Sequence, residues 1–136
     1  MRNVFVAFVI LVVAGSLVAG FYFLGPPAEQ RARRMDERRT SDLERLRLAI
    51  DLYWSRNGHV PSSLDELAKE SGTQIYSQDP ETRDGYEYRA MEEPQDRGQK
   101  YQMCASFSRP SEQPYGFWAH PGGRQCFDII ARRIRP

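Results

Sequence analysis

An unbroken apolar segment at residues 4–24 is the feature that most constrains this chain, because it contains no charged side chain. At about 1.5 Å per residue, a helix of this length spans roughly 30 Å, the thickness of the hydrocarbon core of a bilayer. The chain that follows is polar and rich in arginine. We therefore predict an N-terminal transmembrane anchor over residues 1–27, with membrane lipid as the partner of residues 4–24.

A cleaved secretory signal peptide is the alternative interpretation of this segment. The apolar core of a signal peptide is commonly about 7–15 residues, shorter than this run. The small residues at 14–16 and 18–20 would nevertheless suit a signal peptidase. We favour an anchor that stays in place.

The remainder of the chain, roughly 110 residues, is enough for one modest domain. The net charge of +1 predicts no electrostatic binding to nucleic acid. A basic tail is predicted at residues 131–136. Residues 28–41 are predicted to form a charged linker or a helix extension, and they contain a cluster of five arginines. These five are Arg31, Arg33, Arg34, Arg38 and Arg39.

The five arginines are candidates for contact with anionic lipid headgroups, where each basic residue is worth about 1 kcal/mol. A solvated linker is the alternative. The cluster also bears on orientation, because positive residues beside a membrane helix tend to remain in the cytoplasm. That rule alone would place the domain inside the cell.

The two cysteines, Cys104 and Cys126, favour the opposite orientation. An even number of cysteines in a small exported domain suggests a disulfide, and closing a loop of about twenty residues would contribute about 3 kcal/mol. Two reduced, buried thiols in a cytoplasmic domain are the alternative. We favour the disulfide, and with it a periplasmic or otherwise extracytoplasmic domain.

A helix is predicted from Thr40 or Ser41 to residue 57, because apolar residues recur there at helical spacing. The opposite side carries Leu48 and Leu52, four residues apart, which could meet a second surface. The predicted packing face consists of Leu43, Leu46, Ile50, Tyr53 and Trp54.

After residue 80 the apolar period changes to two, which indicates strands. Alternation at residues 86–88, 100–107, 117–119 and 125–129 predicts an antiparallel meander. A helix followed by such a sheet is typical of an α+β domain, predicted here over residues 42–130.

A series of motifs follows the predicted helix: an Asn-Gly stop, a proline, a short Leu-x-x-Leu helix, and an Asp-Pro pair before a Tyr-x-Tyr strand. This order resembles the type IV pilin-like proteins and, among them, the major pseudopilins of type II secretion. The residues that carry the resemblance are Asp42, Leu46, Ala49, Ile50, Tyr53, Asn57, Gly58, Pro61, Leu64, Leu67, Asp79, Pro80, Tyr86, Tyr88 and Tyr101.

The resemblance implies a pilin-like domain on the bacterial inner membrane that acts through protein partners or self-association in secretion or envelope assembly. Because no catalytic constellation is visible in the sequence, we expect no enzymatic activity and no cofactor. The apolar segment departs from the family pattern: Gly20-Phe21 lies at its far end, and no glutamate occurs within residues 4–24. The family's calcium-binding loop is replaced by residues 121–124. We therefore expect a pilin-like domain on an ordinary anchor.

Metal sites are weakly indicated, and we predict none. Zinc could use Cys104, His120 and Cys126, with His59 as a fourth ligand, but the close cysteine pairs of structural zinc sites are missing from the sequence. Asp79 is expected to satisfy backbone N–H groups in a turn. A weak cation site with Glu81 and Asp84 is the alternative for that segment.

The aromatic segment Tyr115, Phe117 and Trp118 follows two prolines and is the candidate partner-binding site. Core packing is the alternative for these side chains. If this segment recognises a ligand or partner by itself, the chain is a membrane-tethered binding module without a filament role. An envelope enzyme is the third hypothesis, although the sequence contains no nucleophile or phosphate-loop motif.

Overall fold

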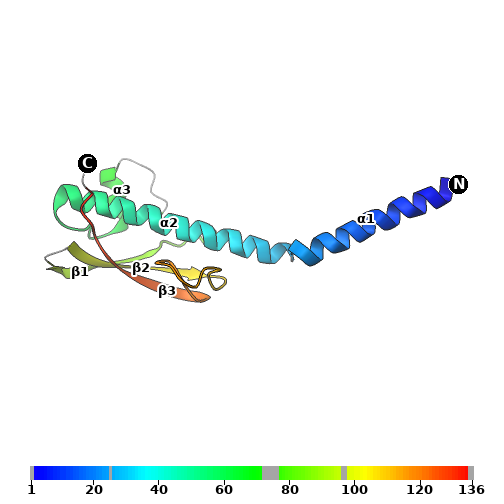
Figure 1. The fold of residues 1–136 in the computed structure, drawn as a ribbon. Coiled ribbons are helices and arrows are strands. Elements are labelled where there is room, and N and C mark those ends of the chain that lie inside the picture. Colours follow the sequence, from blue (N-terminus) through cyan, green and yellow to red (C-terminus); the bar gives the residue numbers. More distant parts are fainter. Residues whose placement is uncertain (1, 25, 72–76, 96–97, 135–136) are drawn as a thin grey trace. The chain divides into compact units, whose positions relative to one another are not determined.

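The structure, a computed structural model, describes residues 2–24, 26–71, 77–95 and 98–134 (Figure 1). The chain divides into two compact units, Met1–Arg33 and Arg34–Pro136. The elements confirm the α+β class, with a long apolar N-terminal helix and a small antiparallel sheet. In order they are α1 (Arg2–Leu24), α2 (Pro27–Asn57), α3 (Leu64–Ser71), β1 (Glu87–Gln95), β2 (Gly98–Phe107) and β3 (Gly123–Ile130).

Helix α1 is apolar on all sides. Its segment Arg2–Phe23 is long and apolar enough to cross a membrane, and none of it is buried inside the protein. An apolar helix with no protein cover is stable in lipid, where its backbone groups are satisfied internally. By length and composition α1 is a candidate membrane anchor or signal sequence.

Helix α2 begins much earlier than the sequence predicted. Pro27 stands in its first turn, where the missing N–H costs no helical hydrogen bond, and Gly58 ends the helix at a φ of 76°. The Thr40 hydroxyl does not cap a helix but donates to the Asp36 carbonyl one turn back, at 3.1 Å. Residues 28–41 are therefore a helix extension, and the compact unit begins at Arg34 rather than at residue 42.

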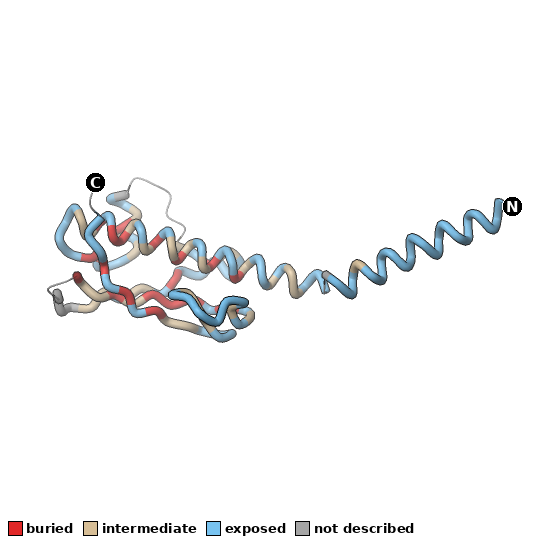
Figure 2. The backbone as a smooth tube through the Cα atoms, in the orientation of Figure 1, coloured by how far each residue is buried: buried red, intermediate tan, exposed pale blue. Residues whose placement is uncertain are grey.

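The side of α2 that faces the sheet forms one half of the core (Figure 2). Leu43, Leu46 and Ile50 are fully buried, Tyr53 is buried, and Trp54 packs at the margin. Each fully buried leucine contributes about 2 kcal/mol of hydrophobic stabilisation. Their spacing in the sequence predicted this face. On the other side of the helix the leucines at 48 and 52 are exposed.

The sheet has the order β1-β2-β3, with both pairs of strands antiparallel. Alternate residues of β2 point to opposite faces. Tyr101, Met103 and Phe107 are buried in the core shared with α2. The alternate residues Gln102, Cys104 and Ser106 lie on the face away from the helix, which we call the outer face.

The strand predicted at residues 117–119 is wrong. This segment lies in the long loop between β2 and β3, residues 108–122. The Ala119 N–H donates to the Gly116 carbonyl at 3.1 Å, which closes a turn and prevents extended pairing. The apolar alternation there comes from loop residues that pack by their side chains.

The segment predicted as a basic tail, residues 131–136, runs across α2 in its described part. Ala131 is fully buried, and the Arg132 N–H donates to the Asp51 carboxylate at 2.8 Å. The Ile134 N–H donates to the Ser55 hydroxyl at 2.9 Å. Residues 135 and 136 lie outside the described residues.

The docking of Arg132 on Asp51 gives a pH-dependent prediction for the variant Asp51→Asn. Burial raises the pKa of Asp51, against the opposing effect of the Arg132 N–H. The folded protein therefore binds this proton more tightly than the unfolded chain, and stability falls as pH rises above the ordinary aspartate range. Between pH 3.5 and pH 7, urea titration should show that the wild type loses unfolding free energy relative to Asp51→Asn. An unchanged difference would contradict it.

Candidate functional site

The loop 108–122 is tied down at its base. The Asp36 carboxylate on α2 accepts the backbone N–H groups of Ser108 and Arg109, each at 2.9 Å. The Ser111 N–H donates to the His120 carbonyl at 2.9 Å and closes the neck of the loop. The His120 ring stacks on Phe107, with ring centroids 3.5 Å apart. The loop is therefore an ordered platform beside α2.

Trp118 fixes the middle of this platform. Its indole N–H donates to the Glu44 carboxylate of α2 at 2.7 Å, and its ring meets the Phe127 ring edge-on with centroids 4.9 Å apart. The side chain is partly buried against the core. Of the three predicted partner-binding residues, Trp118 thus positions the loop rather than presenting itself to solvent.

Phe117 and Tyr115 form the exposed part of the platform, which we call the loop surface. Phe117 is 51% exposed and Tyr115 is 92% exposed. The Arg47 guanidinium lies 5.1 Å from the centroid of the Phe117 ring, a cation–π contact, and it forms a 3.5 Å ion pair with Glu44. The loop surface therefore combines two aromatic side chains with one positive charge.

These roles predict different effects for two substitutions in the loop. Trp118→Phe keeps the aromatic contact but removes the hydrogen bond to Glu44, so it should lower the unfolding free energy by about 1 kcal/mol. Tyr115→Ala should change it by less than about 0.5 kcal/mol, because the ring is solvent-exposed. Urea titrations of the full chain in detergent would measure both. Equal destabilisation by the two variants would show that Tyr115 is packed.

Arg39 lies in a buried charge cluster instead of at a membrane surface. The residue is 3% exposed, and its guanidinium donates to Asp79 at 2.5 and 3.1 Å and to Asp36 and Glu81 at 2.8 Å each. A further hydrogen bond of 3.1 Å reaches the Ser108 hydroxyl. The prediction that Arg39 contacts lipid headgroups is wrong, because its charge is fully engaged inside the domain. We call Arg39, Asp36, Asp79 and Glu81 the Arg39 cluster.

The electrostatics of the cluster keep its central ion pair charged. The Asp79 hydrogen bond raises the pKa of Arg39, against the opposing effect of burial. Burial alone would raise the pKa of Asp79, but the bonds from Arg39 and from the backbone N–H groups of residues 81 and 82 hold it below its usual value. Asp79 thus satisfies backbone N–H groups in a turn, as its position before a proline predicted.

The carboxylates of the alternative cation site belong to the Arg39 cluster. Two of its candidate carboxylates, Asp79 and Glu81, converge on the Arg39 guanidinium, which supplies the positive charge. Among the described residues no group of histidine, cysteine and carboxylate side chains could hold a metal ion. The zinc candidates are not brought together, since both cysteines are bonded to each other and His59 packs against Tyr53.

The other four arginines of the cluster that follows the anchor are exposed. Arg31, Arg34 and Arg38 are exposed along α2, and Arg33 forms an ion pair of 3.1 Å with Glu29 one turn away. Their proposed contact with headgroups remains a prediction.

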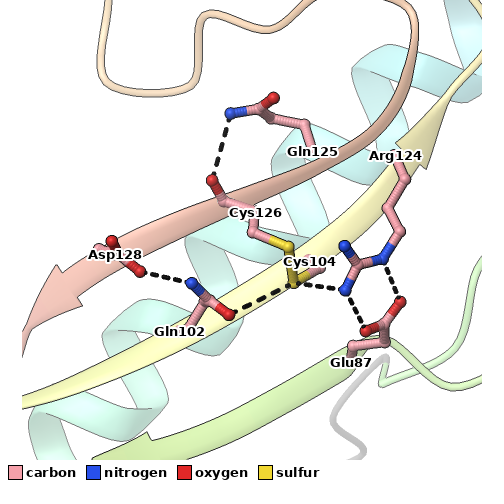
Figure 3. The surroundings of a disulfide bond; sticks show 7 residues. All are labelled: Glu87, Gln102, Cys104, Arg124, Gln125, Cys126 and Asp128. Carbon is pink, nitrogen blue, oxygen red and sulfur yellow. Dashed lines mark hydrogen bonds and ion pairs between the residues drawn. A yellow bond between two sulfur atoms is a disulfide. The ribbon is translucent and has the colours of Figure 1, made fainter.

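The predicted disulfide is present. Cys104 and Cys126 stand directly opposite each other on β2 and β3 and are joined across 22 residues of sequence. The bond lies on the outer face of the sheet (Figure 3). It closes the chain segment that carries the loop surface, so the platform is bounded by a covalent link at its strand ends.

Sequence reasoning missed the Arg39 cluster, although a signal for it exists. The core positions of α2 recur at spacings of three and four residues, and extending the series back from Leu43 reaches Arg39 and then Asp36. When charged residues occupy the next positions of an apolar helix face, they indicate that this face stays buried and that its contacts there are hydrogen bonds and ion pairs. The partner at Asp79 is 40 residues away and is not visible from local pattern.

Comparison of the chain with protein-family models, with curated proteins and with solved structures gives no match. The functional interpretation therefore depends on the residues and on the arrangement described above.

Proposed function

We propose that this chain is a single-pass, pilin-like protein of the bacterial cell envelope, without enzymatic activity, which acts through protein–protein contacts. Helix α1 holds it in the inner membrane, and the unit that begins at Arg34 makes the contacts. The order of a long helix, a short helix and an antiparallel meander supports the resemblance to pilin-like proteins. Secretion or envelope assembly is the process that this resemblance implies.

The observation that carries the proposal is the contrast between the two units. Helix α1 has no buried segment, whereas the second unit closes its own core with α2 on one side and the sheet on the other. The second unit therefore does not need α1 for its packing, and the apolar surface of α1 is left for lipid. A domain held in this way is presented to other proteins at the membrane.

The loop surface is the proposed contact site of the domain. Exposed aromatic side chains on a positioned scaffold are typical of binding hot spots, and Trp118 supplies the positioning through Glu44. The exposed leucines at 48 and 52 of α2 form a second candidate surface. Contacts through α2 would favour self-association or a pilin-like assembly, whereas contacts through the loop alone would favour the binding-module alternative.

The disulfide supports an extracytoplasmic position of the domain, because disulfides persist in oxidising compartments. The exposed arginines next to α1 argue for the opposite side. Protease added to intact spheroplasts should digest the domain and leave the anchor, if the domain faces outward. Protection from protease would show that it faces the cytoplasm.

Site-specific photo-cross-linking in the native membrane tests the contact function. A photo-reactive residue in place of Tyr115 or Leu48 should give discrete adducts of defined mass, whereas the same residue in place of the exposed Arg89 of β1 should not. Adducts from Leu48 that contain a second copy support self-association, and adducts from Tyr115 alone support the binding module. Only monomer at all three positions would contradict a contact function.

A further inference from the structure

The two cysteines of the disulfide differ in how far they are buried on the outer face of the sheet. Cys104 lies on the central strand and is 4% exposed, whereas Cys126 lies on the edge strand β3 and is only partly buried. The two residues therefore differ in their access to solvent. Because α2 covers the other face, any reagent must approach the bond from the outer face or from the edge of the sheet.

An ion pair covers the Cys104 side of the bond. Glu87 of β1 is the register partner of Cys104, and its carboxylate accepts hydrogen bonds of 2.8 and 2.6 Å from the Arg124 guanidinium. Figure 3 shows this pair beside Cys104, with the Arg124 side chain reaching it from β3. The pair therefore stands beside the buried sulfur of Cys104 on the outer face.

The approach to Cys126 is different. Cys126 lies at the edge of the sheet, because β3 pairs only with β2 in the described sheet. Steric access therefore favours attack of an incoming thiolate at Cys126.

The same arginine favours Cys104 as the leaving group. The Arg124 guanidinium lies 3.5 Å from the Cys104 sulfur, where a positive charge stabilises a thiolate. In thiol–disulfide exchange the sulfur that leaves as the more stable thiolate leaves faster. Access at one sulfur and charge stabilisation at the other thus select the same direction of cleavage.

We propose that Cys126 is a site of mixed-disulfide formation with an external thiol, and that Cys104 is released as a thiolate beside Arg124. The attacking thiolate forms a new sulfur–sulfur bond to Cys126 as the Cys104–Cys126 bond breaks, and the electron pair of that bond goes to Cys104. A second thiolate of the same reductant then completes the two-electron reduction and frees Cys126. The partner class is a dithiol oxidoreductase of the envelope.

The direction of cleavage can be read by peptide mapping of the full chain in detergent. The oxidised protein is exposed briefly to 2-mercaptoethanol at pH 7.5, quenched with N-ethylmaleimide and digested. We expect mercaptoethanol on Cys126 and maleimide on Cys104, in roughly tenfold excess over the reverse pattern, from the access and leaving-group effects together. An equal or reversed distribution would overturn the proposal.

Two variants on the outer face separate the effect of Arg124 from a general loss of charge. Arg124→Gln removes the guanidinium beside Cys104 and should reduce both the excess and the rate of opening severalfold. Arg89→Gln removes an exposed arginine from the same face and should leave both unchanged. If Arg124→Gln retained the rate and excess of the wild type, the role of Arg124 in releasing Cys104 would be refuted.

Discussion

Replacing Arg39 with methionine is expected to lower the unfolding free energy of the domain by about 3–5 kcal/mol, the cost of removing one partner from a buried ion pair. Methionine keeps most of the side-chain volume, so the effect isolates the charge. Without the guanidinium, Asp36 and Asp79 remain buried as carboxylates without a counter-ion. A domain of this size has only about 5–15 kcal/mol of net stability, so the variant should be partly unfolded at moderate temperature.

The neighbouring arginine provides a matched control for this substitution. Arg38 stands one position earlier on the same helix and is exposed, so Arg38→Met should change stability by less than about 0.5 kcal/mol. Fluorescence of the two tryptophans during urea unfolding would follow both variants. Similar stability of the two variants would contradict the central role of the Arg39 cluster.

The effect of Arg39→Met should also depend on pH. The pKa of Asp79 lies below its usual value in the folded protein, so the stability that its carboxylate contributes is complete above the ordinary aspartate range. This contribution is lost as pH falls through the lowered pKa. The difference in unfolding free energy between the wild type and Arg39→Met should therefore become smaller in acid.

Much of the fold follows from local pattern. The α+β class, the packing face of α2 and the helix stop at Gly58 depend on spacing and on backbone preferences, which act over a few residues. The disulfide could be predicted because the chain has two cysteines and both fall in alternating segments. Each of these features is encoded close to where it occurs.

The errors occur where polar residues make tertiary contacts. The charge of residues 28–41 leaves a linker and a helix extension equally open, yet Asp36 and Arg39 continue the buried stripe through partners at residues 79 and 108. The sequence makes Trp118 a candidate for partner binding or for core packing, and the structure shows its indole N–H bonded to Glu44 of a distant helix. Polarity predicts exposure only when no complementary group lies across the interface, and local sequence does not contain that information.

Removal of the disulfide is the second large expected effect. The double variant Cys104→Ala/Cys126→Ala should lose about 3 kcal/mol, because the bond closes a loop of 22 residues and restricts the unfolded chain. The unfolded chain should also expose more surface without the cross-link, so the dependence of unfolding on urea should become steeper. Both quantities come from one titration of the full chain in detergent.

Chemical reduction of the wild type separates loop closure from side-chain packing. If the stabilisation comes from closing the loop, the reduced wild type and the double alanine variant should have urea midpoints that agree closely. If it comes instead from packing of the sulfur atoms on the outer face, the alanine variant should be clearly less stable than the reduced protein. An unchanged midpoint in both would show that hydrogen bonding at the base of the loop, through Asp36 and Ser111, is sufficient to hold the loop surface in place.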